Sequence, residues 1–197
     1  ADIDKATLDF NGDTYSLKTA LLEKTVDDQQ QNLISLKSDI ADFNLNGKYR
    51  ITELPAQIIK ALSYYYHFAD VKPEEDYVSG EYANLNLEIK KTNLIEEQFL
   101  PGIEMSTPFL VEGSFSNDEN QVRLSTNLEK AIFQGVELRQ NSVMLDAQRG
   151  ILNFSYYIED IIVKDSTEDD KSVLGLEDFK FDFSSANDSL NYAVTWK

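Results

Sequence analysis

Cysteine is absent from the 197 residues of the chain. A chain without cysteine forms no disulfide, binds no metal through thiolates and has no cysteine nucleophile. The absence does not indicate a compartment, because oxidising compartments permit disulfides without requiring them. The fold must therefore be stable without covalent cross-links.

Histidine is almost absent as well, since His67 is the single one. Mechanisms that need two imidazoles are excluded, and no strained strand-to-helix serine turn accompanies His67 to build a triad. Phosphate-binding glycine loops and metalloprotease motifs are missing too. The acidic stretch 165–170 lacks the glycine and the spaced glutamate of a calcium loop, and we interpret it as a solvated loop. We expect no enzyme activity, no catalytic residue, no metal site and no cofactor.

Basic residues are few, with 18 Lys and Arg against 35 Asp and Glu, which gives a formal net charge of −17. This charge repels phosphate backbones and argues against a nucleic-acid partner. No apolar run approaches the roughly 18 residues of a membrane-spanning helix, and no basic-then-apolar leader opens the chain. With 42% hydrophobic and 11% aromatic residues, the chain is expected to fold as a single domain.

Hydrophobic and polar residues alternate along most of the chain, the pattern of strands with one wet face. The clearest case is Phe179, Phe181 and Phe183, which Lys180 and Asp182 separate. Turn residues such as Asn, Asp and Gly lie between the alternating segments. The pattern predicts an all-β fold with a mostly antiparallel sheet. The expected strands are 8–10, 15–21, 34–40, 43–51, 85–90, 109–115, 122–125, 136–138, 143–147, 152–158, 179–183 and 190–196.

One segment departs from this alternation. Leu54, Ile58, Leu62 and Tyr65 recur at helical spacing, and Pro55 suits the first turn of a helix. We expect one principal helix over 54–69, packed on the sheet as a lid or an end cap.

Glycine–aromatic pairs recur inside the predicted strands, in Gly47-Lys48-Tyr49 and in Gly113-Ser114-Phe115. The segment Leu54-Pro55-Ala56-Gln57 opens the expected helix. Together with the short alternating strands and the Asn/Asp turns, these blocks resemble a TamB-like translocation and assembly module of the AsmA-like superfamily. The resemblance covers most of the chain as a pattern and is strongest over 108–163, but it contains no diagnostic catalytic or binding motif.

This resemblance implies an elongated, open β-taco with an apolar groove. Such a groove would move phospholipids between the inner and outer membranes, support outer-membrane protein assembly, or do both. Residues 1–197 would be one β-rich segment of a longer periplasmic protein anchored in the inner membrane. Its partners would be phospholipid acyl chains and an outer-membrane assembly protein of the TamA/BamA type, and its open sheet edges would allow end-to-end self-association.

Strand parity within each predicted hairpin puts thirteen apolar side chains on one concave face, because a one-residue slip would expose them all. The resemblance implies that this face lines the lipid groove. The thirteen residues are Phe109, Val111, Val122, Leu124, Leu152, Phe154, Tyr156, Phe179, Phe181, Phe183, Leu190, Tyr192 and Val194.

The same strand pattern also fits a closed β-sandwich or barrel that buries its apolar face against itself. Such a fold would act as an adhesion or scaffold module without lipid cargo. The two interpretations differ in whether the interior is open or packed.

Overall fold

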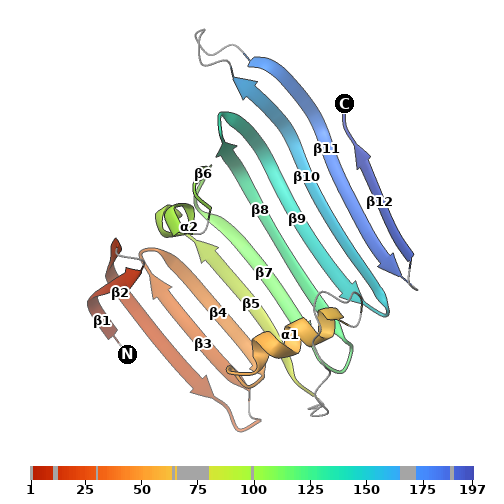
Figure 1. Cartoon of the computed structure of the whole chain (residues 1–197). Coiled ribbons are helices and arrows are strands. Elements are labelled where there is room, and N and C mark those ends of the chain that lie inside the picture. Colours follow the sequence, from red (N-terminus) through yellow and green to blue (C-terminus); the bar gives the residue numbers. More distant parts are fainter. Residues whose placement is uncertain are drawn as a thin grey trace.

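The computed structural model describes residues 2–10, 13–29, 31–63, 65, 80–98, 100–164, 172–186 and 189–197. These residues form one twelve-stranded sheet with two helices (Figure 1). The strands are β1 (Asp2–Phe10), β2 (Asp13–Val26), β3 (Asn32–Ser38), β4 (Ala41–Lys48), β5 (Tyr82–Ile89), β6 (Ile103–Met105), β7 (Phe109–Ser116), β8 (Gln121–Phe133), β9 (Val136–Gln148), β10 (Ile151–Lys164), β11 (Ser172–Ala186) and β12 (Ser189–Thr195).

The strand order follows the sequence, β1-β2-β3-β4-β5-β7-β8-β9-β10-β11-β12. Every pair of strands in this path is antiparallel. The short β6 pairs with the C-terminal end of β8. The hairpin turns after β8 and β9 each have two residues at positive φ, Gln134-Gly135 and Arg149-Gly150. Such turns match the twist of the flanking strands and fix their register.

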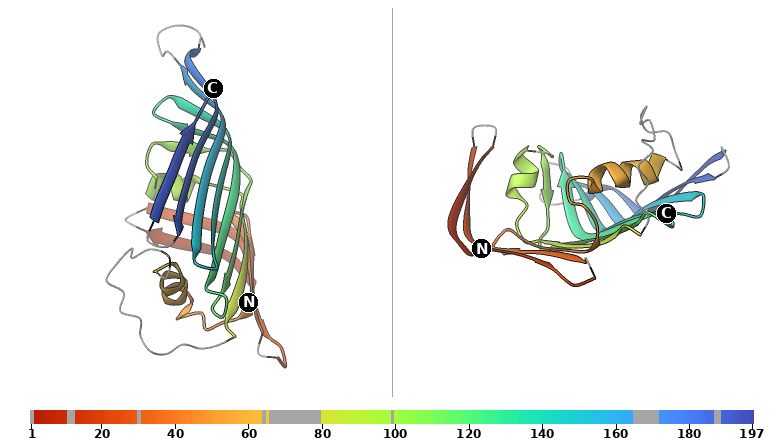
Figure 2. Two further views of the ribbon diagram at one scale, coloured as in Figure 1. Left: turned by 90° about the vertical axis from the view of Figure 1, so that its right-hand side faces the viewer. Right: turned by 90° about the horizontal axis from the view of Figure 1, so that it is seen from below.

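The sheet is open, because its two end strands, β1 and β12, lie far apart and do not pair with each other (Figure 1). The predicted mostly antiparallel, open β fold is confirmed. The alternative of a closed sandwich or barrel is wrong, since the described strands form a single layer that does not close. Figure 2 shows that this layer curves, with α1 (Leu54–Ser63) and α2 (Asn93–Gln98) on the inner side of the curve.

The described residues contain two helices, where one principal helix was expected. The expected helix over 54–69 is α1, which ends at Ser63; Tyr65 lies in a turn, and residues 64 and 66–69 lie outside the described residues. The short α2 was missed, although Asn93 and Glu96 at its start and Pro101-Gly102 after it are ordinary helix boundary signals. In the described part of the chain, neither helix has the length and apolar character of a membrane span.

Gly47 of β4 has a positive φ and lies opposite Ala83 of β5. Its φ is +142°, and a Cβ atom there would overlap the carbonyl oxygen of Tyr82 and lie 2.9 Å from the Cα of Ala83. Both contacts are to backbone, so the strands would have to move apart. Only glycine allows this approach.

Gly47→Ala should therefore destabilise the fold by at least ~2 kcal/mol, through strain and backbone overlap together. The matched control is Gly135→Ala, at φ +83° with nothing within 4 Å, where left-handed strain alone costs about 1 kcal/mol. Chemical denaturation of both variants gives the two values. Equal losses would show that overlap with the β5 backbone is not a constraint at Gly47.

An ion-paired corner joins the β3–β4 turn to the end of β5. Lys90 Nζ lies 2.6 Å from Asp42, and Lys91 Nζ lies 2.6 Å from Asp39. The hydrogen bond from Lys90 lowers the pKa of Asp42, and the bond from Lys91 lowers the pKa of Asp39. Because both folded-state pKa values are depressed, the stabilisation is present above about pH 4 and is lost as the pH falls through the folded values.

Asp42→Asn should lower the melting temperature at pH 7 by about 2–4 °C, the shift that ~1 kcal/mol produces at this chain length. At a pH below the folded value, Asp42 is protonated in both states and the difference from the parent chain should shrink. Thermal unfolding at pH 7 and near pH 2 tests this. Asp28→Asn, at an exposed turn position, is the control, and an unchanged gap between the pH values would contradict the ion-pair account.

Candidate functional site

The strand register decides which side chains share a face, because directly paired residues of antiparallel strands project to the same side. Phe154 pairs with Leu145 and with Phe183, and Phe183 pairs with Tyr192. Following such pairs across the sheet gives continuous rows of side chains. The three central rows are Ala83, Phe115, Val122, Ala147, Leu152, Ser185 and Leu190; Leu85, Gly113, Leu124, Leu145, Phe154, Phe183 and Tyr192; and Leu87, Val111, Thr126, Val143, Tyr156, Phe181 and Val194.

All thirteen residues of the sequence-based site therefore lie on one face, which we call the apolar face. Eleven of them lie in the three rows, and the other two continue the same face, Phe109 opposite Ile89 and Phe179 opposite Ile158. The apolar face is the one on which α1 packs, and it lies inside the curve of the sheet (Figure 2).

The apolar face extends beyond the thirteen residues into the N-terminal half of the sheet. Leu45 pairs with Leu85, and Phe43 pairs with Leu87. Ile34 and Leu36 of β3 face Leu45 and Phe43 in turn. These residues were not among the thirteen expected from the sequence, although their period-two alternation is the same signal that identified the others.

Helix α1 covers the middle of the apolar face. Ala61 is fully buried in a cluster with Phe115, Val122, Ala147 and Leu152. The end of the helix is tied down by Tyr65, whose hydroxyl donates a hydrogen bond to the carbonyl oxygen of Asn120. The Ser185 hydroxyl, 3.3 Å away, donates to the carbonyl oxygen of Tyr65. The helix is thus held at the β7–β8 turn and at β11.

A cavity of about 400 Å³ lies between α1 and the sheet. Leu54, Ile58 and Leu62 line its helix side. On the sheet side Gly113 contributes no side chain, and the wall is formed by apolar groups that include Leu45, Leu85, Leu124 and Leu145. The volume is within the range of small-molecule pockets, roughly 300–1,000 Å³.

On the apolar face, exposure is low beneath α1 and high on β12. Val122 and Leu152, beneath α1, are 6% and 2% exposed, whereas Tyr192 is 78% exposed. Leu124, Leu190 and Val194 are also exposed. The remaining members of the thirteen are half-buried: Phe109, Val111, Phe154, Tyr156, Phe179, Phe181 and Phe183. The apolar face is thus partly packed and partly open to water.

A polar group lies within the apolar face at Tyr156. Its hydroxyl donates a hydrogen bond to the side-chain oxygen of buried Asn141 at 3.1 Å, and burial raises the pKa of Tyr156. The Asn141 amide donates to the carbonyl oxygens of Leu128 and Leu138. The side chain of Asn141 thus accepts one hydrogen bond and donates two, and these bonds order the sheet. The Tyr156 hydroxyl stays uncharged at neutral pH.

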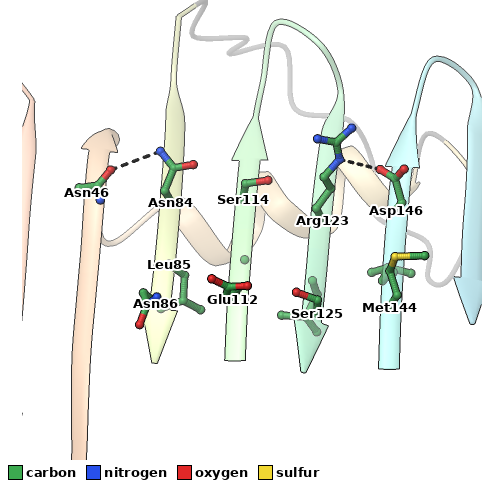
Figure 3. Close-up of a pocket in the computed structure, with 13 residues that line it drawn as sticks. Asn46, Asn84, Leu85, Asn86, Glu112, Ser114, Arg123, Ser125, Met144 and Asp146 are labelled. Carbon is green, nitrogen blue, oxygen red and sulfur yellow. Dashed lines mark hydrogen bonds and ion pairs between the residues drawn. The ribbon is translucent and has the colours of Figure 1, made fainter. Parts of the chain in front are cut away.

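The opposite face of the sheet is polar. A shallow hollow of about 650 Å³ there is lined by Asn46, Asn84, Arg123 and Asp146, among other polar side chains (Figure 3). The Asn84 amide donates to the side-chain oxygen of Asn46 at 3.3 Å, and Arg123 pairs with Asp146 at 2.9 Å. These groups bind each other across neighbouring strands, as on an ordinary solvated sheet face.

Two features noted in the sequence, His67 and the acidic stretch 165–170, lie outside the described residues. Within the described ranges, no group of three or more metal-ligating side chains is gathered. A scan against models of known families, a search of curated proteins and a search of solved structures each returned no match.

Phe181→Asp should destabilise the fold by about 2–3 kcal/mol, because it puts a carboxylate on the apolar face where the Phe181 ring packs 6.1 Å from that of Phe154. Ser184→Asp, on the same strand but paired with Asn153 and Asn191 of the polar face, should change stability by less than ~1 kcal/mol. Urea denaturation compares the two. Similar losses would refute the assignment of faces.

Proposed function

We propose that the chain is one stretch of an apolar groove that carries phospholipid acyl chains through the periplasm, between the inner and outer membranes. The observation that carries the proposal is the apolar face, which runs without a break from β3 to β12 on an open sheet. No second sheet covers this surface among the described strands, and α1 covers only its centre. Acyl chains provide a cover that needs no specific polar contact.

The binding energy of an acyl chain favours a continuous apolar surface over a single pocket as its binding site. Each methylene group buried against apolar side chains contributes about 0.8 kcal/mol, wherever it lies along the groove. Exposed apolar patches beyond a few hundred Å² are unusual on soluble monomers. Leu124, Tyr192 and Val194 leave part of the apolar face in water, so a bound chain would remove an unfavourable exposure.

The cavity beneath α1 supplies a partly covered place for the end of an acyl chain. Its walls come from α1 and from the centre of the apolar face, and Leu124 belongs both to its wall and to the exposed part of that face. A chain lying on the open part would therefore reach the cavity without crossing a polar surface. In this proposal α1 works as a lid over one part of the groove.

The resemblance to TamB-like modules extends the proposal to the parent protein. In that case the parent would be anchored in the inner membrane and would meet an outer-membrane assembly protein of the TamA/BamA type, without enzymatic activity of its own. The support for this part is the alternating strand pattern together with the open, curved sheet.

A scaffold without cargo is the second candidate, and α1 favours it, because the helix already buries the centre of the apolar face. In that case the exposed part of the face would bind protein and no lipid would accompany the purified chain. Lipid content separates the two candidates directly.

The test is extraction and mass spectrometry of lipid from the purified chain, with Leu124→Glu and Ser125→Glu as a matched pair. Both substitutions add one negative charge to β8, the first on the cavity wall and the second on the polar face. We expect phospholipid in the parent and Ser125→Glu proteins and at least tenfold less in Leu124→Glu, because a carboxylate beside the acyl chain is poorly solvated.

Circular dichroism checks that both variants remain folded. Absence of phospholipid from the folded, unsubstituted chain, also after incubation with phospholipid vesicles, would refute the lipid-groove proposal. The scaffold function would then be the remaining candidate. Equal lipid in both variants would show that lipid binds elsewhere than on the apolar face.

A further inference from the structure

Strand β12 is an edge strand with water on both faces. Among the described strands it has β11 as its one neighbour, and all seven of its residues are exposed (Figure 1). Leu190, Tyr192 and Val194 point to the apolar face by register. Tyr192 is 78% exposed, and Trp196, just beyond the strand, is 59% exposed. A row of unpaired backbone groups therefore runs beside a row of exposed apolar side chains.

Proteins usually protect such edges with charged residues or proline. Strand β12, Ser-Leu-Asn-Tyr-Ala-Val-Thr, has neither. The other end strand, β1, contains Asp2, Asp4, Lys5 and Asp9 in nine residues. The charged β1 matches the protected type of edge, and the uncharged β12 does not.

We propose that β12 pairs antiparallel with β12 of a second copy of this chain, about a twofold axis at Tyr192. This register pairs every residue of the seven-residue strand, with Tyr192 opposite Tyr192 and Leu190 opposite Val194. Because the paired residues have the same parity, the two apolar faces lie on the same side and form one surface. The proposal goes beyond the lipid function and holds whether or not the groove carries lipid.

The area available for burial fits a modest dimer. A Tyr or Trp ring has ~150–250 Å² to bury, so the exposed parts of Tyr192 and Trp196 offer at most roughly 550 Å² over two copies. Leu190, Val194 and the backbone edge add to this, and the contact belongs to the small interfaces of weak or transient complexes.

Charge disfavours a contact between two copies of β1. Two copies carry −17 each, and their repulsion is screened beyond about 8 Å at physiological salt, so the charges at the contact matter most. A β1–β1 contact would oppose strands that each carry three aspartates. A β12–β12 contact opposes two strands without charge, and twofold symmetry closes it at two copies instead of growing into a fibre.

The absence of cysteine from the chain permits a direct test by single-cysteine cross-linking. Opposed residues of antiparallel strands have Cα atoms about 4.5–5.5 Å apart, within disulfide range, and a residue two positions off the axis does not reach its own copy. Tyr192→Cys should therefore cross-link to itself under mild oxidation. Leu190→Cys and Val194→Cys should not cross-link alone but should do so when mixed with each other. Met144→Cys, exposed on β9, is the control.

The dimer itself is followed by sedimentation velocity of the parent chain from low to high micromolar concentration. We expect a reversible change from one to two copies, and Tyr192→Lys should raise the dissociation constant at least tenfold, because like charges would meet at the axis. This variant should still fold, since Tyr192 is exposed. A mass of one copy throughout, growth beyond two copies, or equal cross-linking of all four cysteine variants would overturn the proposal.

Discussion

The pairing register of neighbouring antiparallel strands is the constraint on which the structure depends. Because side chains alternate across a strand, a slip of one residue would transfer a whole row to the other face. The register is regular from β7 to β10, where Phe115, Val122, Ala147 and Leu152 meet in one row. Packing of α1, the cavity beneath it and the polar opposite face all follow from that alignment.

Much of the sheet was predictable because most strands have one solvent-exposed face and one apolar face. Such a strand alternates polar and apolar residues with a clear period of two. The pattern was lost where the backbone leaves the regular strand conformation. Strand β9 was predicted as two pieces, 136–138 and 143–147, and between them Gln140 has a φ of +49°. The three-residue β6 is too short to show a period.

The sequence predicted which residues share the apolar face, but it did not predict which of them α1 covers. Alternation alone placed thirteen residues on the apolar face, since parity is a local property, although Ile34, Leu36, Phe43 and Leu45 of the same face were not among them. It contained no information on which of them α1 buries, because the helix reaches Val122 and Leu152 from more than fifty residues away in sequence. The cavity depends on the missing side chain of Gly113 and on the height of the helix above the sheet, which only the tertiary structure gives.

The strand order has a consequence for how the chain is made. Nearly every strand pairs with the one that precedes it in sequence, so each new hairpin can dock as soon as it leaves a ribosome or a translocation pore, without waiting for a distant partner. Such a sheet behaves as a nearly one-dimensional array in which stability is added unit by unit. A hairpin could be duplicated or deleted in evolution without rerouting the rest of the chain, and the length of the sheet would change while its two faces stayed the same.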